Sequence, residues 1–290
     1  KGIAMGIANI IPGVSGGTIA LITDIYEDLI RSLKSIDLKA LKLIASLRIN
    51  EFIKYTNFYF LLAVFGGSVA SVFSIAKLFE YLFDESPILI WSLFFGLILS
   101  SVFFVAKQIK SWSIRNISSL SLGCIIASSL LFIPPASENN NLIFIFICGV
   151  ISISGMLLPG LSGSFILIIM GNYELIFVTS IIEFDYLVLG IFILGSVIGL
   201  IGFSHVLNWL LKSHRDLVLS LLSGFIIGSL LLIWPWKHAA KTMIINGNEK
   251  ILSYHWYFPE INNQETLFSF FLIISGTLIV YLLDRVSKRR

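Results

Sequence analysis

Residues 11–30, IPGVSGGTIALITDIYEDLI, and residues 158–177, LPGLSGSFILIIMGNYELIF, are two copies of one motif. Each copy interrupts an apolar stretch with Pro-Gly-x-Ser-Gly. A helix cannot run smoothly through that sequence, because proline lacks an amide donor and glycine loosens the backbone. Broken backbone at membrane depth survives only where protein buries it or where it lines a wet cavity. We therefore predict re-entrant pairs of half-helices at 2–23 and 141–171. At an offset of 147 the copies share eight identities: Pro12/Pro159, Gly13/Gly160, Ser15/Ser162, Gly16/Gly163, Ile19/Ile166, Ile22/Ile169, Tyr26/Tyr173 and Glu27/Glu174.

The similarity continues after the motifs at a smaller offset of 128. The offset is smaller because the first copy contains a longer basic loop. Here Gly67-Ser68 aligns with Gly195-Ser196, and Gly96 aligns with Gly224. We predict two repeats, 1–140 and 141–290, each with one hairpin and three spans, so that the second copy is inverted. Inverted repeats build alternating-access transporters whose site lies at the repeat interface near the midplane. The alternative is that small residues merely pack helices closely.

The composition places the chain in a membrane. Of 290 residues, 57% are hydrophobic and 13% are charged, whereas ordinary soluble domains carry about 25% charged residues. The net charge of +3 leaves no basic surface that calls for nucleic acid. The predicted fold class is an all-α integral membrane protein.

Six apolar stretches approach the roughly 20 residues that a span needs. With six spans and two re-entrant hairpins, one side of the membrane receives sixteen Lys and Arg residues and the other receives three. If both broken segments crossed fully, the division would be twelve to seven. The positive-inside rule therefore favours the re-entrant arrangement with both termini in the cytoplasm. The predicted spans are 57–83, 87–106, 117–134, 186–211, 216–236 and 267–284.

The broken hairpins are candidate phosphate sites. The half-helix after each break presents its positive end and amide donors, which suit an anion, and nearby hydroxyls can add donors. If the hairpins dip in from opposite faces, two such ends converge on one cavity. A structural break, or a cation site built from freed carbonyls, stays open as the alternative. The candidate residues are Pro12, Gly13, Ser15, Gly16, Gly17, Thr18, Pro159, Gly160, Ser162, Gly163 and Ser164.

Polar residues inside or beside the spans are candidates for gating or proton coupling, because charge in a membrane is costly. Lys77 aligns with His205 at the same offset of 128, as inverted symmetry requires of two gates. The alternatives are snorkelling for these two and ordinary solvated helix ends for the glutamates. The candidates are Asn9, Glu27, Lys77, Glu80, Glu174 and His205. No catalytic group, metal site or cofactor is predicted.

The loop 24–56 mixes apolar positions with six cations. This pattern predicts an amphipathic helix lying on the anionic cytoplasmic surface. The sequence does not separate a regulatory role from simple anchoring.

GIANIIPGVSGGTIAL at 6–21, followed by IYEDLI at 25–30, and PGLSGSFILIIMGNYELI at 159–176 resemble the motifs of a known bacterial family. The family is that of the polyprenyl-phosphate (undecaprenyl-phosphate) transporters, formerly of unknown function. The resemblance implies a location in the bacterial inner membrane. It implies that the protein moves this carrier lipid from the outer to the cytoplasmic leaflet for cell-envelope biosynthesis. It also implies that the matching motif residues hold the phosphate head group. One departure is that Thr23-Asp24-Ile25 stands where the family pattern has a glycine before Tyr-Glu.

Three functions remain in competition. A flippase for undecaprenyl phosphate needs a small polar site that opens sideways to the bilayer. A secondary transporter or channel for a small soluble anion needs a laterally closed site. A polyprenyl-diphosphate phosphatase needs clustered His, Arg or acidic groups at membrane depth, which the hairpins lack. We expect a transporter rather than an enzyme. The expected partners are the lipid and the bilayer, and a second copy of the chain is a further candidate.

Overall fold

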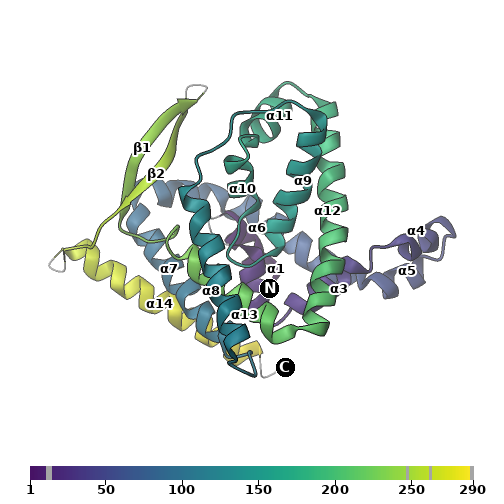
Figure 1. Cartoon of the computed structure of the whole chain (residues 1–290), viewed down its shortest axis with the longest axis horizontal. Coiled ribbons are helices and arrows are strands. Elements are labelled where there is room, and N and C mark those ends of the chain that lie inside the picture. Colours follow the sequence, from purple (N-terminus) through teal and green to yellow (C-terminus); the bar gives the residue numbers. More distant parts are fainter. Residues whose placement is uncertain (11–14, 246–247, 261–262, 288–290) are drawn as a thin grey trace.

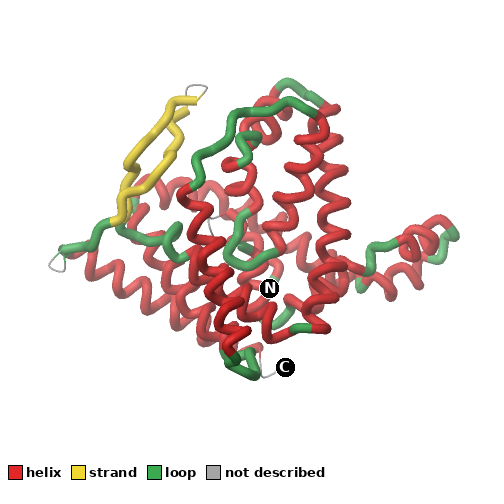
Figure 2. The backbone as a smooth tube through the Cα atoms, viewed as in Figure 1, coloured by secondary structure: helices red, strands yellow, loops and turns green. Residues whose placement is uncertain are grey.

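The computed structural model describes residues 1–10, 15–245, 248–260 and 263–287, and helices dominate it (Figure 1). Figure 2 shows how few strands accompany them. The elements, in chain order, are α1 (Gly2–Ile10), α2 (Gly16–Ile22), α3 (Tyr26–Lys34), α4 (Leu38–Ala45), α5 (Ile49–Thr56), α6 (Phe58–Glu85), α7 (Pro87–Ala106), α8 (Ile114–Ser129), the 3₁₀ turn η1 (Leu130–Phe132), α9 (Leu142–Leu157), α10 (Gly163–Ile169), the π-helical η2 (Leu175–Thr179), α11 (Ser180–Ile182), α12 (Tyr186–Ser213), α13 (Arg215–Ser229), β1 (Lys237–Ile245), β2 (Asn248–Trp256) and α14 (Gln264–Ser287).

Five of the described helices are long and apolar enough to cross a membrane: α6, α7, α8 (continued by η1), α12 and α14. They coincide with five of the six predicted spans. The chain is therefore a multi-pass membrane protein. Several hydroxyls within these helices donate to carbonyls on the preceding turn, as Ser92 does to Ile88, which satisfies them in an apolar surrounding.

The sixth expected span, 216–236, is shorter than predicted. Helix α13 has 15 residues, about 22 Å at 1.5 Å per residue. After Ser229 the chain tightens into a turn in which the Leu230 amide donates to Ile227 O and the Leu232 amide donates to Ser229 O. Pro235 also disfavours helical conformation at the residue before it, so the apolar run continues as an irregular segment.

The most extensive helix contacts form two sets. α1 packs along α6 and α9 packs along α12, while α8 packs along α13 and α7 packs along α14. The close approach of α7 to α14 and of α8 to α13 depends on glycine. A Cβ on Gly96 would lie 2.1 Å from Ile273 O of α14, and one on Gly224 would lie 2.0 Å from Leu120 O of α8. These glycines are the pair that the sequence repeat aligned, and small residues at helix contacts are typical of membrane proteins.

The sequence predicts one amphipathic helix over 24–56, whereas the structure has three short helices there. Asp24, Leu47 and Asn57 adopt positive φ and turn the chain at its start, middle and end. Helix α3 is buried through Tyr26, Leu29 and other residues, and it packs against α12. The apolar face that suggested a membrane-surface helix therefore serves packing in this first part. Figure 1 shows α4 and α5 standing away from the other helices.

A β-hairpin supplements the predicted all-α architecture. β1 and β2 pair antiparallel, with Lys237 opposite Trp256, in the stretch expected to be only a long loop. At its base, the indole N–H of Trp256 donates to Leu231 O at 2.9 Å and that of Trp234 donates to Tyr257 O at 3.2 Å. These bonds fix the hairpin to the end of α13.

Candidate functional site

The first predicted hairpin, 2–23, contains α1 and α2, and the extended Ser15 directly precedes α2. Pro12 and Gly13, which were predicted site residues, lie outside the described residues. Ser15 has extended backbone and caps α2, because its Oγ accepts a hydrogen bond from the Gly17 amide at 3.1 Å. All seven residues of α2 are buried. The motif therefore breaks the helix as predicted, and its second half lies inside the protein.

The amide donors at the start of α2 already have acceptors. The Gly16 amide donates to Asn9 Oδ1 at 2.7 Å, and the Thr18 amide donates to Ser15 O at 2.9 Å. We expected unpaired amides at this position. An anion at this position would have to replace the Asn9 carboxamide oxygen as the acceptor of the Gly16 amide.

Three hydrogen bonds join the second hairpin to the first hairpin and to the start of α3. Ser15 Oγ donates to Met156 O at 3.0 Å, and Tyr26 Oη donates to Leu157 O at 2.9 Å. The Gly160 amide donates to Thr18 Oγ1 at 3.1 Å. The two backbone segments approach so closely that a Cβ on Gly17 would lie 2.9 Å from Leu157 O. The two motifs, 147 residues apart, therefore meet at one junction.

The second hairpin is arranged differently at its helix start. Gly160 has φ +81°, a conformation that favours glycine, and Pro159 lies next to Gly17. Ser162 and Ser164 share a hydrogen bond of 2.9 Å between their hydroxyls in an exposed position. Leu167 alone is buried among the α10 residues Gly163–Ile169. The two copies of the motif thus have different surroundings.

Both hairpins end in the same backbone motif. The Gly171 amide donates to Ile168 O at 3.0 Å and the Asn172 amide to Leu167 O at 3.1 Å; 147 residues earlier, the Asp24 amide donates to Leu21 O at 3.2 Å and the Ile25 amide to Ala20 O at 2.9 Å. Asp24 (φ 56°) and Gly171 (φ 78°) hold the left-handed position that commonly ends a helix. Asp24 thus takes the place that Gly171 has in the second copy, and the turn is the same despite the different residue.

A cavity of about 330 Å³ lies against the first hairpin. Its lining is apolar apart from Asn9, Ser68 and the glycine backbone, and it reaches Phe65, Val69 and Phe73 on the exposed side of α6. The predicted site residues Asn9, Gly16 and Gly17 line it, whereas Ser162, Gly163 and Ser164 do not. The lining residues are Met5, Asn9, Gly16, Gly17, Leu29, Val64, Phe65, Ser68, Val69, Phe73, Ile153, Met156, Leu157 and Leu200.

Glu27, a predicted gating residue, lies outside this cavity and pairs with an arginine that the sequence analysis did not single out. Arg215 Nε donates to Glu27 Oε1 at 2.8 Å. Its other guanidinium nitrogens reach Gln108, donating to the backbone oxygen and to Oε1 at 3.3 Å each. This clamp joins α3, the α7–α8 loop and the start of α13. Arg215 does not belong to the repeated motif, and its partner Glu27 lies 188 residues away, so no sequence pattern pairs them.

The other predicted polar residues are dispersed. Lys77 is exposed on α6, Glu174 is buried, and the side chain of Glu80 lies outside the described ones. His205 Nδ1 lies 2.9 Å from Ile201 O, on the preceding turn of α12. The structure therefore does not gather these residues with Asn9 and Glu27 at one place. Among the described residues, no three His, Cys, Asp or Glu side chains could hold a metal ion.

These features define a multi-pass helical membrane protein whose polar centre is a pair of touching broken helices beside an apolar cavity. The chain belongs to the undecaprenyl phosphate translocase-like family (VCA0040-like), whose model matches residues 5–251. It is 40% identical over 251 residues to the "Polyprenyl-phosphate transporter" of Vibrio cholerae, covering 87% of this chain and 81% of that protein. It is 28% identical over 253 residues to the "Polyprenyl-phosphate transporter" of Staphylococcus aureus, covering 81% and 84%. No solved structure matches the chain.

Proposed function

We propose that this protein transports polyprenyl phosphate, moving undecaprenyl phosphate from the outer to the cytoplasmic leaflet by alternating access. The observation that carries the proposal is the junction of the two hairpins beside a laterally placed apolar cavity. The names of the Vibrio cholerae and Staphylococcus aureus relatives support the lipid as substrate.

An inverted repeat is the proposed framework. If the halves 1–140 and 141–290 are related by inversion, α1 corresponds to α9, α6 to α12, α7 to α13 and α8 to α14. The contact of α1 with α6 then has its counterpart in α9 with α12, and that of α7 with α14 has its counterpart in α13 with α8. The matching turns at Asp24 and Gly171 support the same relation. Such repeats place a substrate at their interface.

The cavity suits an isoprenoid lipid better than a small soluble anion. Moving a prenyl chain into water costs about 0.8 kcal/mol per CH₂, so the chain should remain among apolar side chains and lipid while only the phosphate crosses. Phe65, Val69 and Phe73 line the cavity and are also exposed on the α6 surface, 44%, 55% and 84% respectively. They supply an apolar edge along which a chain could lie. A site for a soluble anion would call for a polar lining.

The phosphate is proposed to bind at the hairpin junction. In this site the Gly16 amide would leave Asn9 Oδ1 and donate to the anion, while Asn9 Nδ2 adds a second donor. Ser15, Gly17 and Thr18 complete the first half. The residues Pro12 and Gly13, and the second-motif residues Pro159, Gly160, Ser162, Gly163 and Ser164, are proposed to contribute as the site opens to the other side. Burying a phosphate without such donors would be prohibitively costly.

The asymmetry of the hairpins fits one state of an alternating cycle. α2 is wholly buried, whereas the Ser162–Ser164 hydroxyl pair is exposed. On the proposed orientation, with both termini in the cytoplasm, the site is closed on the cytoplasmic side and the second hairpin is accessible from outside. The Arg215–Glu27–Gln108 clamp would then be part of the cytoplasmic gate. Glu174, Lys77, Glu80 and His205 stay candidates for gating or coupling.

The protein is proposed to act without chemical conversion of its substrate. Hydrolysis of a phosphate ester calls for an acid, a base or a nucleophile pair around the reacting atoms. Among the described residues that line the cavity, the polar side chains are Asn9 and Ser68. Neither ionises in the working range, so the cavity offers binding groups rather than a reactive pair.

The test is a leaflet-exchange assay in proteoliposomes with a fluorescent polyprenyl phosphate. A phosphatase added outside converts the outer-leaflet lipid, and the protein should make the inner-leaflet pool accessible. The matching polyprenol without phosphate, in an assay suited to an uncharged lipid, should show no acceleration by the protein. Uptake of inorganic phosphate tests the soluble-anion alternative. Failure to accelerate exchange of the phosphorylated lipid over protein-free liposomes would contradict the proposal.

A further inference from the structure

The arm formed by α4 and α5 (37–56) carries an exposed apolar surface that its own fold does not bury. Leu38 is 76% exposed, Leu47 is 83% exposed, and Leu41, Ile44 and Ile49 are 43–59% exposed. Ala40 and Leu43, on the other side of α4, are buried. Figure 1 shows the arm standing apart from the other helices. Leu38, Leu41 and Ile44 recur at a spacing of three along α4, so they lie toward one side of that helix rather than as scattered single side chains.

The arm is braced internally, so this surface has a fixed shape. Asp37 caps α4 by accepting hydrogen bonds from the Lys39 and Ala40 amides at 2.9 and 3.0 Å, and it also accepts from Tyr55 Oη of α5 at 2.7 Å. Desolvation raises the pKa of Asp37, but these hydrogen bonds outweigh it and lower the pKa below its usual value. The carboxylate is ionised at neutral pH and holds α4 to α5.

The charges of the arm complement an anionic surface. Its cations are Lys39, Lys42, Arg48 and Lys54, and its acids are Asp37 and Glu51. Glu51 is paired with Arg48 at 2.6 Å, and Asp37 is occupied by the brace. The three lysines are exposed, and Lys39 also lies over the Tyr55 ring at 4.5 Å. The arm thus has a net positive charge beside its apolar face.

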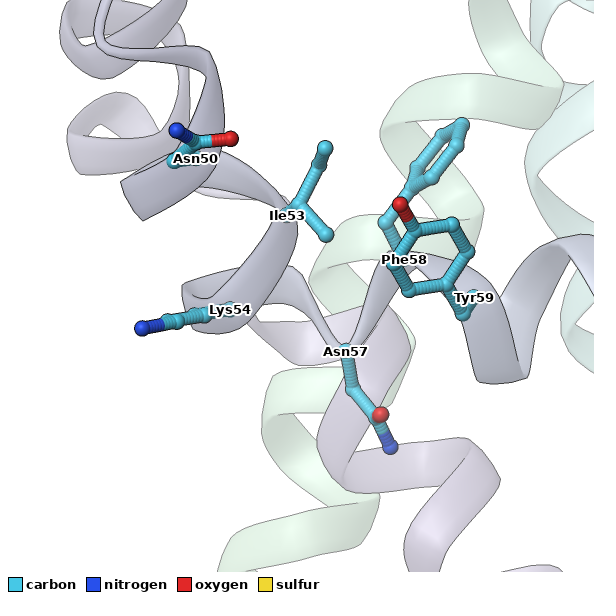
Figure 3. A pocket seen from close by; sticks show the side chains of 6 residues that line it. All are labelled: Asn50, Ile53, Lys54, Asn57, Phe58 and Tyr59. Atoms are coloured by element: carbon cyan, nitrogen blue, oxygen red, sulfur yellow. The ribbon is translucent and has the colours of Figure 1, made fainter.

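The elbow between α5 and α6 connects this face to the membrane span. A groove of about 420 Å³ lies there, lined by Asn50, Ile53, Lys54, Asn57, Phe58 and Tyr59. Figure 3 shows Ile53 near the rings of Phe58 and Tyr59, with Lys54 extending away from the rings. The span begins at Phe58, directly after Asn57, whose φ is 51°. Exposed apolar side chains therefore lie on both sides of the elbow, on the arm and at the start of α6.

We infer that the α4–α5 arm docks on the bilayer surface through anionic phospholipids, its apolar side chains entering the interface and Lys39, Lys42 and Lys54 meeting the head groups. An exposed apolar face flanked by lysines is the pattern of interfacial helices. Each cation near an anionic membrane shifts the partition by roughly fivefold. A second copy of the arm is a poorer partner, because two net-positive arms repel. The inference does not depend on the transport function.

The test follows a fluorescent probe on the arm in nanodiscs. Leu47→Cys is labelled with an environment-sensitive dye, and the parent chain, with its native Cys124 and Cys148, measures background labelling. Discs contain either zwitterionic phosphatidylcholine or its mixture with phosphatidylglycerol, and spin-labelled lipids quench a buried probe. The matched control is Glu51→Cys combined with Arg48→Gln, which removes the Arg48–Glu51 ion pair as a unit and leaves the net charge of the arm unchanged. In anionic discs, the emission of the probe at position 47 should shift to the blue and be quenched by the spin-labelled lipids. The emission of the probe at position 51 should remain that of a probe in water.

The variant K39Q/K42Q/K54Q keeps the Arg48–Glu51 pair and the Asp37 brace. Its Leu47 probe should lose the extra quenching that phosphatidylglycerol causes. Raising the salt from about 0.1 M to about 1 M, which shortens the Debye length from about 10 to about 3 Å, should have the same effect. An aqueous Leu47 probe in anionic discs, equal quenching in both disc types, or oxidative cross-linking of two Leu47→Cys copies in place of lipid quenching would each overturn the inference.

Discussion

Asn9→Asp is the substitution that tests the proposed phosphate site most directly. Asn9 Oδ1 accepts the Gly16 amide at 2.7 Å at the edge of the cavity. A carboxylate oxygen of nearly the same shape can accept that bond, so the hairpin should keep its fold. The substitution removes the Nδ2 donor, however, and places a negative charge beside the proposed phosphate. Binding should therefore fall while folding is preserved.

The expected magnitude follows from Coulomb's law. Two unit charges about 4 Å apart at an effective dielectric constant of about 20 repel by about 4 kcal/mol. This corresponds to a loss of affinity of about a thousandfold. The matched control, Asn9→Ser, removes the amide without adding charge and should cost about tenfold, as expected for one hydrogen bond. The difference between the two variants isolates the charge on the ligand.

The assay is binding of polyprenyl phosphate, measured by native mass spectrometry and by leaflet exchange, with thermal unfolding as the check on folding. A protonated carboxyl carries no charge and can donate a hydrogen bond, so affinity should recover as the pH falls and the introduced group is protonated. Equal losses for Asn9→Asp and Asn9→Ser, or no loss for either, would refute a phosphate at Asn9 and Gly16. Unchanged binding of a phosphate-free polyprenol is the specificity control.

Three further predictions concern the junction, the clamp and the β-hairpin. Thr18→Val leaves the buried Gly160 amide without its acceptor and should lower the free energy of unfolding by about 1–3 kcal/mol, whereas Thr18→Ser should restore it in thermal unfolding. Arg215→Gln removes a partly exposed ion pair worth up to about 1 kcal/mol, so labelling of a cysteine placed at Gln108 should rise by up to about fivefold, and the exchange E27R/R215E should reverse part of that rise. Burial lowers the pKa of Lys237 from 10.5 to about 7, although its contact with the Trp91 ring at 4.0 Å opposes the shift. Between those pH values the unfolded state binds more protons than the folded state. The base of the β-hairpin should therefore become more stable as the pH rises above about 7 and less stable as it falls back toward 7. Amide hydrogen exchange should show this dependence in the parent chain but not in Lys237→Met.

The breaks in the two apolar segments could be predicted because they depend on local chemistry. Pro-Gly-x-Ser-Gly interrupts a helix in any context, and α2 and α10 begin at Gly16 and Gly163, inside the motif. Five spans could be predicted for the same reason, since length and hydropathy suffice. Expectation and structure differ where tertiary contacts decide. α3 has the amphipathic pattern of a membrane-surface helix, yet its apolar face is buried against α12.

The site could be predicted only in part, because its contacts join distant residues. The motif singles out Ser15 and Thr18, but their acceptor and donor partners, Met156 O and the Gly160 amide, belong to backbone that sequence reasoning does not pair. The Tyr26 hydroxyl likewise reaches Leu157 O, although Tyr26 recurs as Tyr173 in the repeat and could have been examined for that reason. Arg215 had no such signal.

A sequence repeat does not predict which of its two copies is buried in a given state. The proposed mechanism requires this, because each copy should be buried in one state and exposed in the other. If the halves exchange roles during alternating access, the two hairpins are equivalent over the cycle and inequivalent at every moment of it. The structure shows such an inequivalence. α2 is enclosed, with its first-turn amides bonded to Asn9 and Ser15, while Ser162 is half-buried, Ser164 is exposed, and their hydroxyls bond to each other. The opposite state should then free the Gly16 amide and enclose the second hairpin, so Ser162 and Ser164 should become less accessible to solvent whenever the Arg215–Glu27 clamp opens.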